Sequence, residues 1–255
     1  MGGNLFLNTT AVNKAYIKNT VESLFNDHLS MLGVHEYRYI GSTGKTNVSG
    51  DIDICISCSP TNKQALASQL KKRLGENNVK ISGQNISIKY QIFGFSNCYA
   101  QIDLMLSDKY SLDDTAWLMS GDNDSGVKGV YRNLMLCHIA KNVSNKMNDN
   151  EKITISFPGG LQYKQLCGKK WVCKNKKITN PNKILGILGI TADPANVITF
   201  TQLVDHMLNN KTLSTYLDDF HNYINNYIVN DPENANRAIW YIKTKKRLKN
   251  EQEAA

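Results

Sequence analysis

Apolar residues in the first third of the chain recur at helical spacing in two segments and predict two amphipathic helices. The first helix is expected at residues 12–29, beginning after Thr9 and Thr10, whose hydroxyls are candidate N-terminal caps. The second is expected at residues 62–74. Their apolar faces consist of Val12, Tyr16, Ile17, Val21, Leu24, Phe25 and Leu29 in the first, and Ala65, Leu66, Leu70 and Leu74 in the second. We expect both helices to pack on a sheet.

Between and after these helices the pattern becomes that of β-strands. Strands are predicted at residues 36–40, 51–58, 79–82 and 86–92, and along the apolar run around Asp103, at residues 99–106. Together they predict a small mixed sheet with the helices against it. This unit is expected to end near residue 110.

The pattern of apolar residues changes in the second half of the chain and predicts mainly helices. A helix is predicted at residues 127–142, and further helices at 182–188, 199–208, 213–229 and 234–248. Short strands at residues 153–157, 161–166 and 170–173 predict a small β-hairpin region. The fold class expected is therefore α/β (α+β), with a sheet domain at residues 1–112 and a mainly helical domain at residues 113–255.

The charge of the chain favours an anionic partner. The formal net charge is +8 and the pI is about 9.1, and the basic excess lies in residues 164–177 and 243–249. No apolar run reaches the roughly 20 residues that a membrane helix needs, and no signal-peptide pattern is present. We therefore expect a cytoplasmic protein without a membrane partner, in the host cytoplasm if the source is viral.

Three aspartates in the predicted sheet are candidate functional residues. Asp51 and Asp53 lie one residue apart at the start of a strand, so their side chains point to the same face, roughly 6–7 Å apart. Asp103 interrupts an apolar strand, where an ionised group is costly unless it faces a cation or solvent. Carboxylate oxygens are hard ligands that suit Mg²⁺ or Mn²⁺. The three residues therefore predict a metal site.

The turn Gly41-Ser42, the Asp51-x-Asp53 strand start and the later Asp103 together resemble the DNA polymerase β superfamily of nucleotidyltransferases. A looser likeness, in the glycine-rich start and in residues 41–46, 130–133 and 178–181, is to uncharacterised tailed-phage proteins of this kind. The resemblance implies two metal ions, with Asp51 and Asp53 holding the ion on the triphosphate and all three aspartates holding the second. It implies that Gly41 and Ser42 cradle the β- and γ-phosphates.

Three basic residues are further candidates for nucleotide binding. Lys45 is expected either to add a charge beside the triphosphate or to be a solvated loop residue. Lys128 and Arg132 lie one helical turn apart and are expected either to contact the phosphates or to form an ordinary exposed helix face. Residues 41–46 also mimic the end of a P-loop. Tyr39 stands where that motif needs glycine, and no helix follows, so we exclude a P-loop enzyme.

The resemblance implies transfer of a nucleoside monophosphate from a nucleoside triphosphate such as ATP to a hydroxyl. We expect the acceptor to be an RNA 3′ end, of a tRNA or another RNA, because the second domain is basic. One alternative is a protein or small-molecule hydroxyl. Another is a non-catalytic nucleic-acid-binding or virion-associated protein. The late aromatic residues are expected in the core, with base stacking as the alternative: Tyr216, Phe220, Tyr223, Tyr227, Trp240 and Tyr241.

Overall fold

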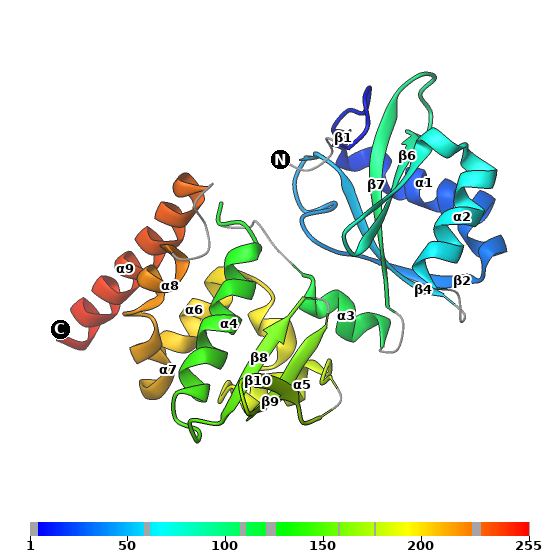
Figure 1. Cartoon of the computed structure of the whole chain (residues 1–255). Helices are drawn as coiled ribbons and strands as arrows, with labels where there is room; N and C mark the ends of the chain where they lie inside the picture. The colour runs from blue at the N-terminus through cyan, green and yellow to red at the C-terminus, as the bar shows by residue number, and fades with distance from the viewer. Residues whose placement is uncertain are drawn as a thin grey trace. The chain divides into compact units, whose positions relative to one another are not determined.

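The structure, a computed structural model, describes residues 5–58, 62–107, 111–120, 126–157, 159–175, 177–225 and 231–254. The chain divides into two compact units, Met1–Ala116 and Trp117–Ala255. The boundary predicted between residues 112 and 113 falls inside helix α3 (Leu112–Leu118), a helix that the sequence pattern did not predict. Figure 1 labels the elements of both units, which are described separately below.

The first unit is built on the five-stranded mixed sheet β2-β4-β7-β6-β5. Its strands are β2 (Val34–Tyr39), β4 (Ile52–Cys58), β5 (Val79–Ser82), β6 (Asn85–Gln91) and β7 (Tyr99–Leu106). The central pair β4 and β7 is parallel, whereas the other pairs are antiparallel. The predicted mixed sheet is therefore confirmed, and every predicted strand of this unit lies within two residues of its expected position.

Two helices cover one face of this sheet. Residues of α1 (Lys14–Leu24) and α2 (Lys63–Leu74) form one core with Ile52, Ile54 and Ile56 of β4. Because neighbouring residues of a strand point to opposite faces, Asp53 lies on the face away from this core. In sequence order, α1 continues as a π-helical turn, Phe25–Leu29, and the 3₁₀ turn Ser30–Leu32.

The start of α1 differs from the prediction. The helix begins at Lys14, because the side chain of Asn13 caps it by accepting a hydrogen bond from the backbone N–H of Ala15 (2.9 Å). Val12–Asn13 (β1) instead pairs with Val48–Ser49 (β3) as a two-stranded antiparallel ribbon. The threonines expected as caps therefore precede a short strand.

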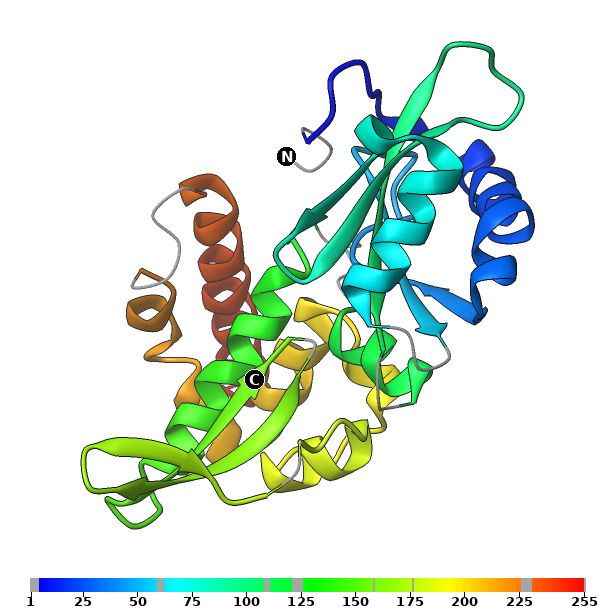
Figure 2. The ribbon, with the colours of Figure 1, turned by 45° about the vertical axis from the view of Figure 1, so that its right-hand side comes forward.

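The second unit combines helices with a small sheet. Helix α4 (Val130–Ser144) packs on the antiparallel sheet β10-β9-β8, formed by β8 (Glu151–Ser156), β9 (Gly160–Cys167) and β10 (Lys170–Cys173). Figure 2 shows the green helix α4 running beside the yellow-green strands. The expected hairpin is thus a three-stranded sheet, and one of its faces is buried through Ile153 and Leu161.

Helices complete the core of this unit. They are α5 (Pro181–Ile187), the 3₁₀ turn Pro194–Val197, α6 (Phe200–Leu208), α7 (Lys211–Tyr216), α8 (Phe220–Asn225) and α9 (Pro232–Ala254). The single helix predicted at residues 213–229 is therefore two helices as far as residue 225, and residues 226–229 lie outside the described ranges. Within those ranges, no helix is both long and apolar enough to cross a bilayer.

The late aromatic residues are only partly in the core. Tyr216, Phe220 and Tyr223 are buried, as predicted. The prediction was wrong for Trp240, which is 67% exposed because it lies on the outer side of α9. Tyr241 packs against the core, and Tyr227 lies outside the described residues.

Candidate metal centre

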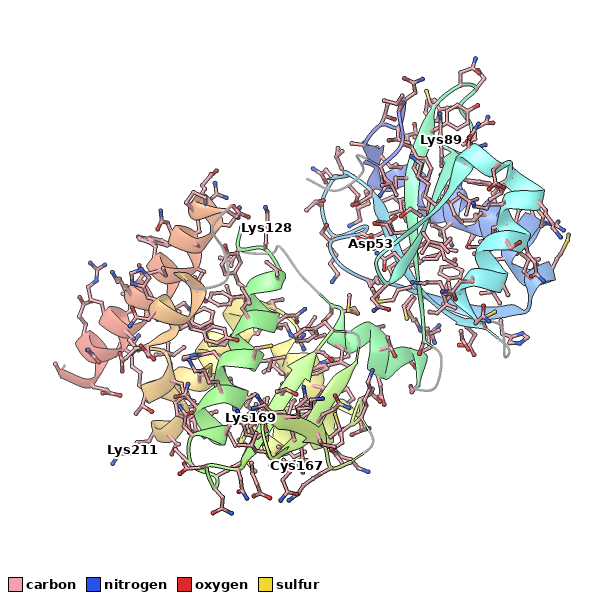
Figure 3. The ribbon with its side chains drawn as sticks, in the orientation of Figure 1. Asp53, Lys89, Lys128, Cys167, Lys169 and Lys211 are labelled. Atoms are coloured by element: carbon pink, nitrogen blue, oxygen red, sulfur yellow. The ribbon has the colours of Figure 1, made fainter. Side chains whose placement is uncertain are left out.

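The parallel pairing of β4 and β7 brings two of the three aspartates together. Asp53 and Asp103 are register partners on adjacent strands, and Asp51 lies two residues before Asp53, where the chain enters β4. Each residue offers a carboxylate oxygen, and these oxygens lie within 4.8 Å of one another. None of the three is exposed. The trio could therefore hold a metal ion, and Figure 3 marks Asp53 on the sheet of the first unit.

The electrostatics of the trio fit a cation. Burial, and after it the negative charges of Asp51 and Asp103, together raise the pKa of Asp53 to about 7. Carboxylates held this close repel one another, and a divalent cation between them would reverse the repulsion. Three carboxylate oxygens are also the hard donors expected around Mg²⁺, Mn²⁺ or Ca²⁺.

A tight turn, residues 40–45, fixes the backbone at the start of β4. The N–H of Ile40 donates to the C=O of Asp53 (3.1 Å), and the N–H of Asp53 donates to Oγ1 of Thr43 (2.7 Å). The N–H of Thr43 donates to the C=O of Ile40 (3.3 Å), and its side chain is buried. Sequence reasoning missed Thr43, because a threonine in a polar turn carries no signal for this hydrogen bond.

Gly41 of this turn lies against the side chain of Asp53. Its φ is +60°, and a Cβ added there would lie 2.9 Å from Oδ2 of Asp53. Both the backbone conformation and the space therefore require glycine. Ser42 follows in the same turn and is partly buried. The structure thus places the predicted residues Gly41 and Ser42 beside the acidic trio, while their contact with phosphates stays a prediction.

Gln101 supports the third acid. Its Nε2 donates to both carboxylate oxygens of Asp103 (3.1 and 3.2 Å), and its Oε1 accepts from the N–H of Leu5 (3.0 Å). Gln101 is buried and lies two residues from Asp103, on the same face of β7. Sequence reasoning missed it. A polar residue in an apolar strand, at the same alternation as the acid, is the signal that could have found it.

The structure places Lys45 in the turn of the first unit and Lys128 in the second unit. Lys45 is partly buried in the turn, and its N–H donates to the C=O of Ser42 (3.2 Å). Lys128 lies just before α4 in the second unit, with its Nζ 2.7 Å from Oδ2 of Asp231. A hydrogen bond from Asn234 and then one from Lys128 lower the pKa of Asp231.

The alternative that Arg132 belongs to an ordinary exposed helix face was wrong. The residue is fully buried in the second unit, and its guanidinium carbon lies 4.2 Å from the ring centroid of Trp117. Its Nε donates to the C=O of Val197 (2.8 Å) and its Nη1 to the C=O of Trp117 (3.3 Å). Burial lowers its pKa to about 9. Its Nη1 also donates to Oδ1 of Asn133 (3.0 Å), so Arg132 is a packing residue that binds carbonyl oxygens within the second unit.

The described residues contain one group of three or more His, Cys, Asp or Glu side chains that could hold a metal ion, namely Asp51, Asp53 and Asp103. The six cysteines all lie within the described residues, and none of them forms a disulfide. Comparison with known proteins found no matching family model and no matching curated protein, so the chemistry of this centre has to follow from its own residues.

Proposed function

We propose that the chain is a metal-dependent nucleotidyltransferase with a first unit of the polymerase β kind. The observation that carries this proposal is the convergence of Asp51, Asp53 and Asp103 beside a glycine-containing turn, on the face of a mixed sheet away from its helical core. The proposed reaction moves a nucleoside monophosphate from a triphosphate to an acceptor hydroxyl.

In the proposed reaction, the acceptor oxygen forms a bond to the α-phosphorus of the triphosphate. The bond between this phosphorus and the bridging oxygen breaks, pyrophosphate leaves with that electron pair, and the hydroxyl proton passes to water. Two Mg²⁺ or Mn²⁺ ions would neutralise charge on the phosphates and lower the pKa of the attacking hydroxyl. Asp51 and Asp53 would hold the ion on the triphosphate, and Asp103 would complete the second site with them.

The chain's own residues would supply positioning. Gln101 holds both oxygens of Asp103 by hydrogen bonds, so this carboxylate keeps one orientation on β7. In the turn, the backbone N–H groups of Thr43, Gly44 and Lys45 already donate within the chain. We therefore assign the β- and γ-phosphates to Gly41 and Ser42, with Lys45 as a nearby positive charge.

The proposed acceptor is an RNA 3′ end. The net charge of +8 favours a polyanionic acceptor over a neutral small molecule. Transfer to a protein or small-molecule hydroxyl, and a non-catalytic role in nucleic-acid binding, are the alternatives that the test below separates.

The test is incubation of the protein with each labelled nucleoside triphosphate, Mg²⁺ or Mn²⁺, and RNA, DNA or protein acceptors. We expect release of pyrophosphate and label on RNA. The double variant Asp51→Asn, Asp53→Asn should be inactive, whereas Glu76→Gln, which changes an exposed acid of the same unit, should retain activity. Label on protein would favour the alternative acceptor. Absence of transfer with every triphosphate, metal and acceptor would contradict the enzymatic proposal.

A further inference from the structure

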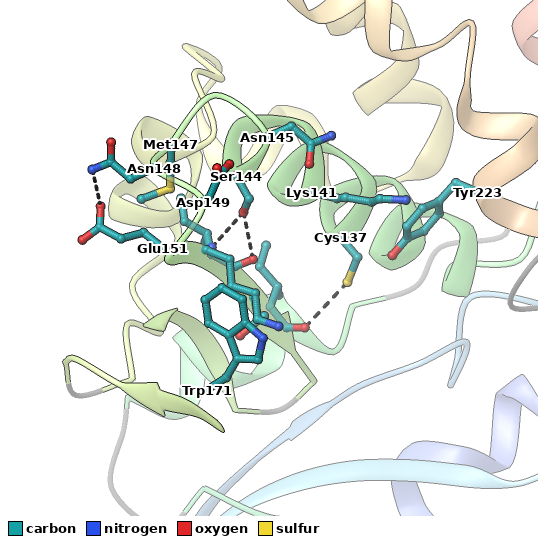
Figure 4. Close-up of a pocket in the computed structure, with 14 residues that line it drawn as sticks. Cys137, Lys141, Ser144, Asn145, Met147, Asn148, Asp149, Glu151, Trp171 and Tyr223 are labelled. Carbon is teal, nitrogen blue, oxygen red and sulfur yellow. Dashed lines mark hydrogen bonds between the residues drawn. The ribbon is translucent and has the colours of Figure 1, made fainter. Parts of the chain in front are cut away.

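A groove in the second unit lies between α4 and the edge strand β8. Its volume is about 740 Å³, within the range of roughly 300–1,000 Å³ typical of ligand sites. Lys141 and Ser144 of α4, Lys152 and Thr154 of β8, Trp171 of β10 and Tyr223 of α8 are among its lining residues. Figure 4 shows Trp171 at one side of this groove, and Lys141 with Tyr223 at another.

The wall of the groove is held by hydrogen bonds from helix to strand. Oγ of Ser144 accepts from the N–H of Ile153 (2.8 Å) and donates to its C=O (3.2 Å). Sγ of Cys137 donates to the C=O of Ile155 (3.7 Å). The outward backbone groups of β8 are thus engaged at Ile153, which disfavours addition of a peptide strand there and leaves side chains to select the ligand.

One side of the groove continues onto the solvent face of the β8–β10 sheet. Lys152 pairs with Lys164, Lys164 with Cys173, and Leu166 with Trp171, so these side chains share one face. The opposite face is buried in the core. Trp171 is 37% exposed on this solvent face, with Nζ of Lys152 3.9 Å from its ring centroid. An exposed indole with an ammonium group beside its ring is a stacking surface for an anionic aromatic ligand.

A second pair of a lysine and an aromatic ring lines the same groove. Nζ of Lys141 lies 5.8 Å from the ring centroid of Tyr223. Glu151, one of the two acids in the lining, has its charge compensated by Lys174, at 2.5 Å. The other acid is Asp149. Lysines are therefore the main uncompensated charges around the two rings.

Most residues that line this groove belong to a segment of the sequence that carries most of the chain's net positive charge. Residues 141–177 contain nine lysines and two acidic residues, a net charge of +7 against +8 for the whole chain. A high local density of lysines attracts a polyanion, while exposed aromatic rings add affinity only for ligands with accessible ring faces. A duplex hides its base faces, and an acidic peptide has none.

We propose that this groove and the adjoining solvent face bind single-stranded nucleic acid, with one base stacked on Trp171 and phosphates beside Lys141, Lys152 and Lys164. The assignment of the bound strand as the acceptor of nucleotidyl transfer rests on the proposed function. The binding itself does not, because every residue invoked belongs to the second unit.

The test measures binding of labelled 12-nucleotide RNA and DNA single strands, the matching duplexes and poly-glutamate by fluorescence anisotropy, in EDTA and without triphosphate. We expect Trp171→Ala to weaken single-strand binding by roughly tenfold, and Trp171→Phe by less, because phenylalanine keeps a stacking ring. The matched control is Trp240→Ala, which removes an exposed tryptophan from α9. Affinity should be higher for single strands than for duplexes or poly-glutamate.

The contribution of the lysines is tested through the salt dependence of the binding constant. Each phosphate contact adds about 0.7 to the magnitude of the slope of log K against log salt for single strands. The double variant Lys141→Ala, Lys152→Ala should therefore flatten the slope by about 1.4, whereas Lys211→Ala, an exposed lysine on α7, should leave it nearly unchanged. Circular dichroism of each variant verifies that the unit is folded.

Several results would overturn this proposal. They are equal affinity of Trp171→Ala and the unaltered protein, equal binding of duplex and single strand, or equal binding of poly-glutamate. Comparison of RNA with DNA shows which strand is preferred. The variant Asp51→Asn, Asp53→Asn should bind single strands normally but transfer no nucleotide. The binding measurement therefore tests the groove, and the transfer measurement tests the metal centre, so the two proposals can fail separately.

Discussion

At the scale of single residues, Asp53 makes the metal-free protein sensitive to pH. Its pKa is 3.8 in the unfolded chain and about 7 in the folded one, because of burial and the two neighbouring acids. Stability from this group is complete below pH 4 and is lost as the pH rises through 7. The loss has an upper bound on the order of 4 kcal/mol.

The variant Asp53→Asn tests this pH dependence. We expect urea unfolding in EDTA to show the variant more stable than the unaltered protein at pH 8, with the difference shrinking toward pH 5. Adding Mg²⁺ at pH 8 should stabilise the unaltered protein and leave the variant unchanged. A stability difference that does not change with pH would contradict this account of Asp53.

Gly41 allows a second residue-scale prediction, with a close control in the same turn. Gly41→Ala places a methyl group 2.9 Å from Oδ2 of Asp53 in a left-handed conformation, whereas Gly44→Ala has a similar φ (+71°) and no atom within 4 Å. Both should lose about 1–2 kcal/mol of stability. Calorimetric titration with Mn²⁺ should show weaker binding for Gly41→Ala alone, and equal affinities would rule out the steric role.

Gln101 should control metal affinity through the orientation of Asp103. Because Gln101→Leu removes both hydrogen bonds to that carboxylate, we expect Mn²⁺ to bind about tenfold more weakly. Gln91→Leu changes an exposed glutamine on β6 and is the control. Unchanged affinity in a folded Gln101→Leu protein would contradict a positioning role for this residue.

At the scale of elements, α4 depends on the buried side chain of Arg132. Arg132→Met would leave the carbonyls of Val197 and Trp117 without these donors and should destabilise the second unit by about 3 kcal/mol. Arg132→Lys should recover little, since lysine lacks the planar, forked guanidinium. Thermal unfolding is the measurement. The exposed Arg237→Met is the control, and similar stability of both methionine variants would contradict the prediction.

The sequence predicted the positions of helices and strands better than it predicted which elements and side chains lie next to one another. The alternation of Ile52, Ile54 and Ile56 identified β4 because one face of that strand is buried, and the same reasoning placed Asp53 on the opposite face. Alternation carries no information on which strands pair, so the register of Asp53 with Asp103 needed the structure. Arg132 and Trp240 were misplaced because helical spacing does not say which side faces the core.

At the scale of the whole molecule, the two units have separate cores. The core of the first includes Val12 and Leu104, that of the second Trp117 and Ile242, and no buried residue of the described ranges belongs to both. We therefore expect two unfolding transitions in differential scanning calorimetry. Mn²⁺ should raise only one of them, and Arg132→Met should lower only the other. A single transition that shifts as a whole with Mn²⁺ would contradict this independence.

The distance along the chain between Asp53 and Asp103 has a consequence for synthesis. Helix α2 and strands β5 and β6 are made between them, so a nascent chain that has not yet added β7 lacks the third carboxylate. Ribosome-bound fragments ending before Tyr99 should therefore fail to retain the ion that we propose for the finished protein. Binding of the cation would then indicate that β4 and β7 have formed their parallel pair.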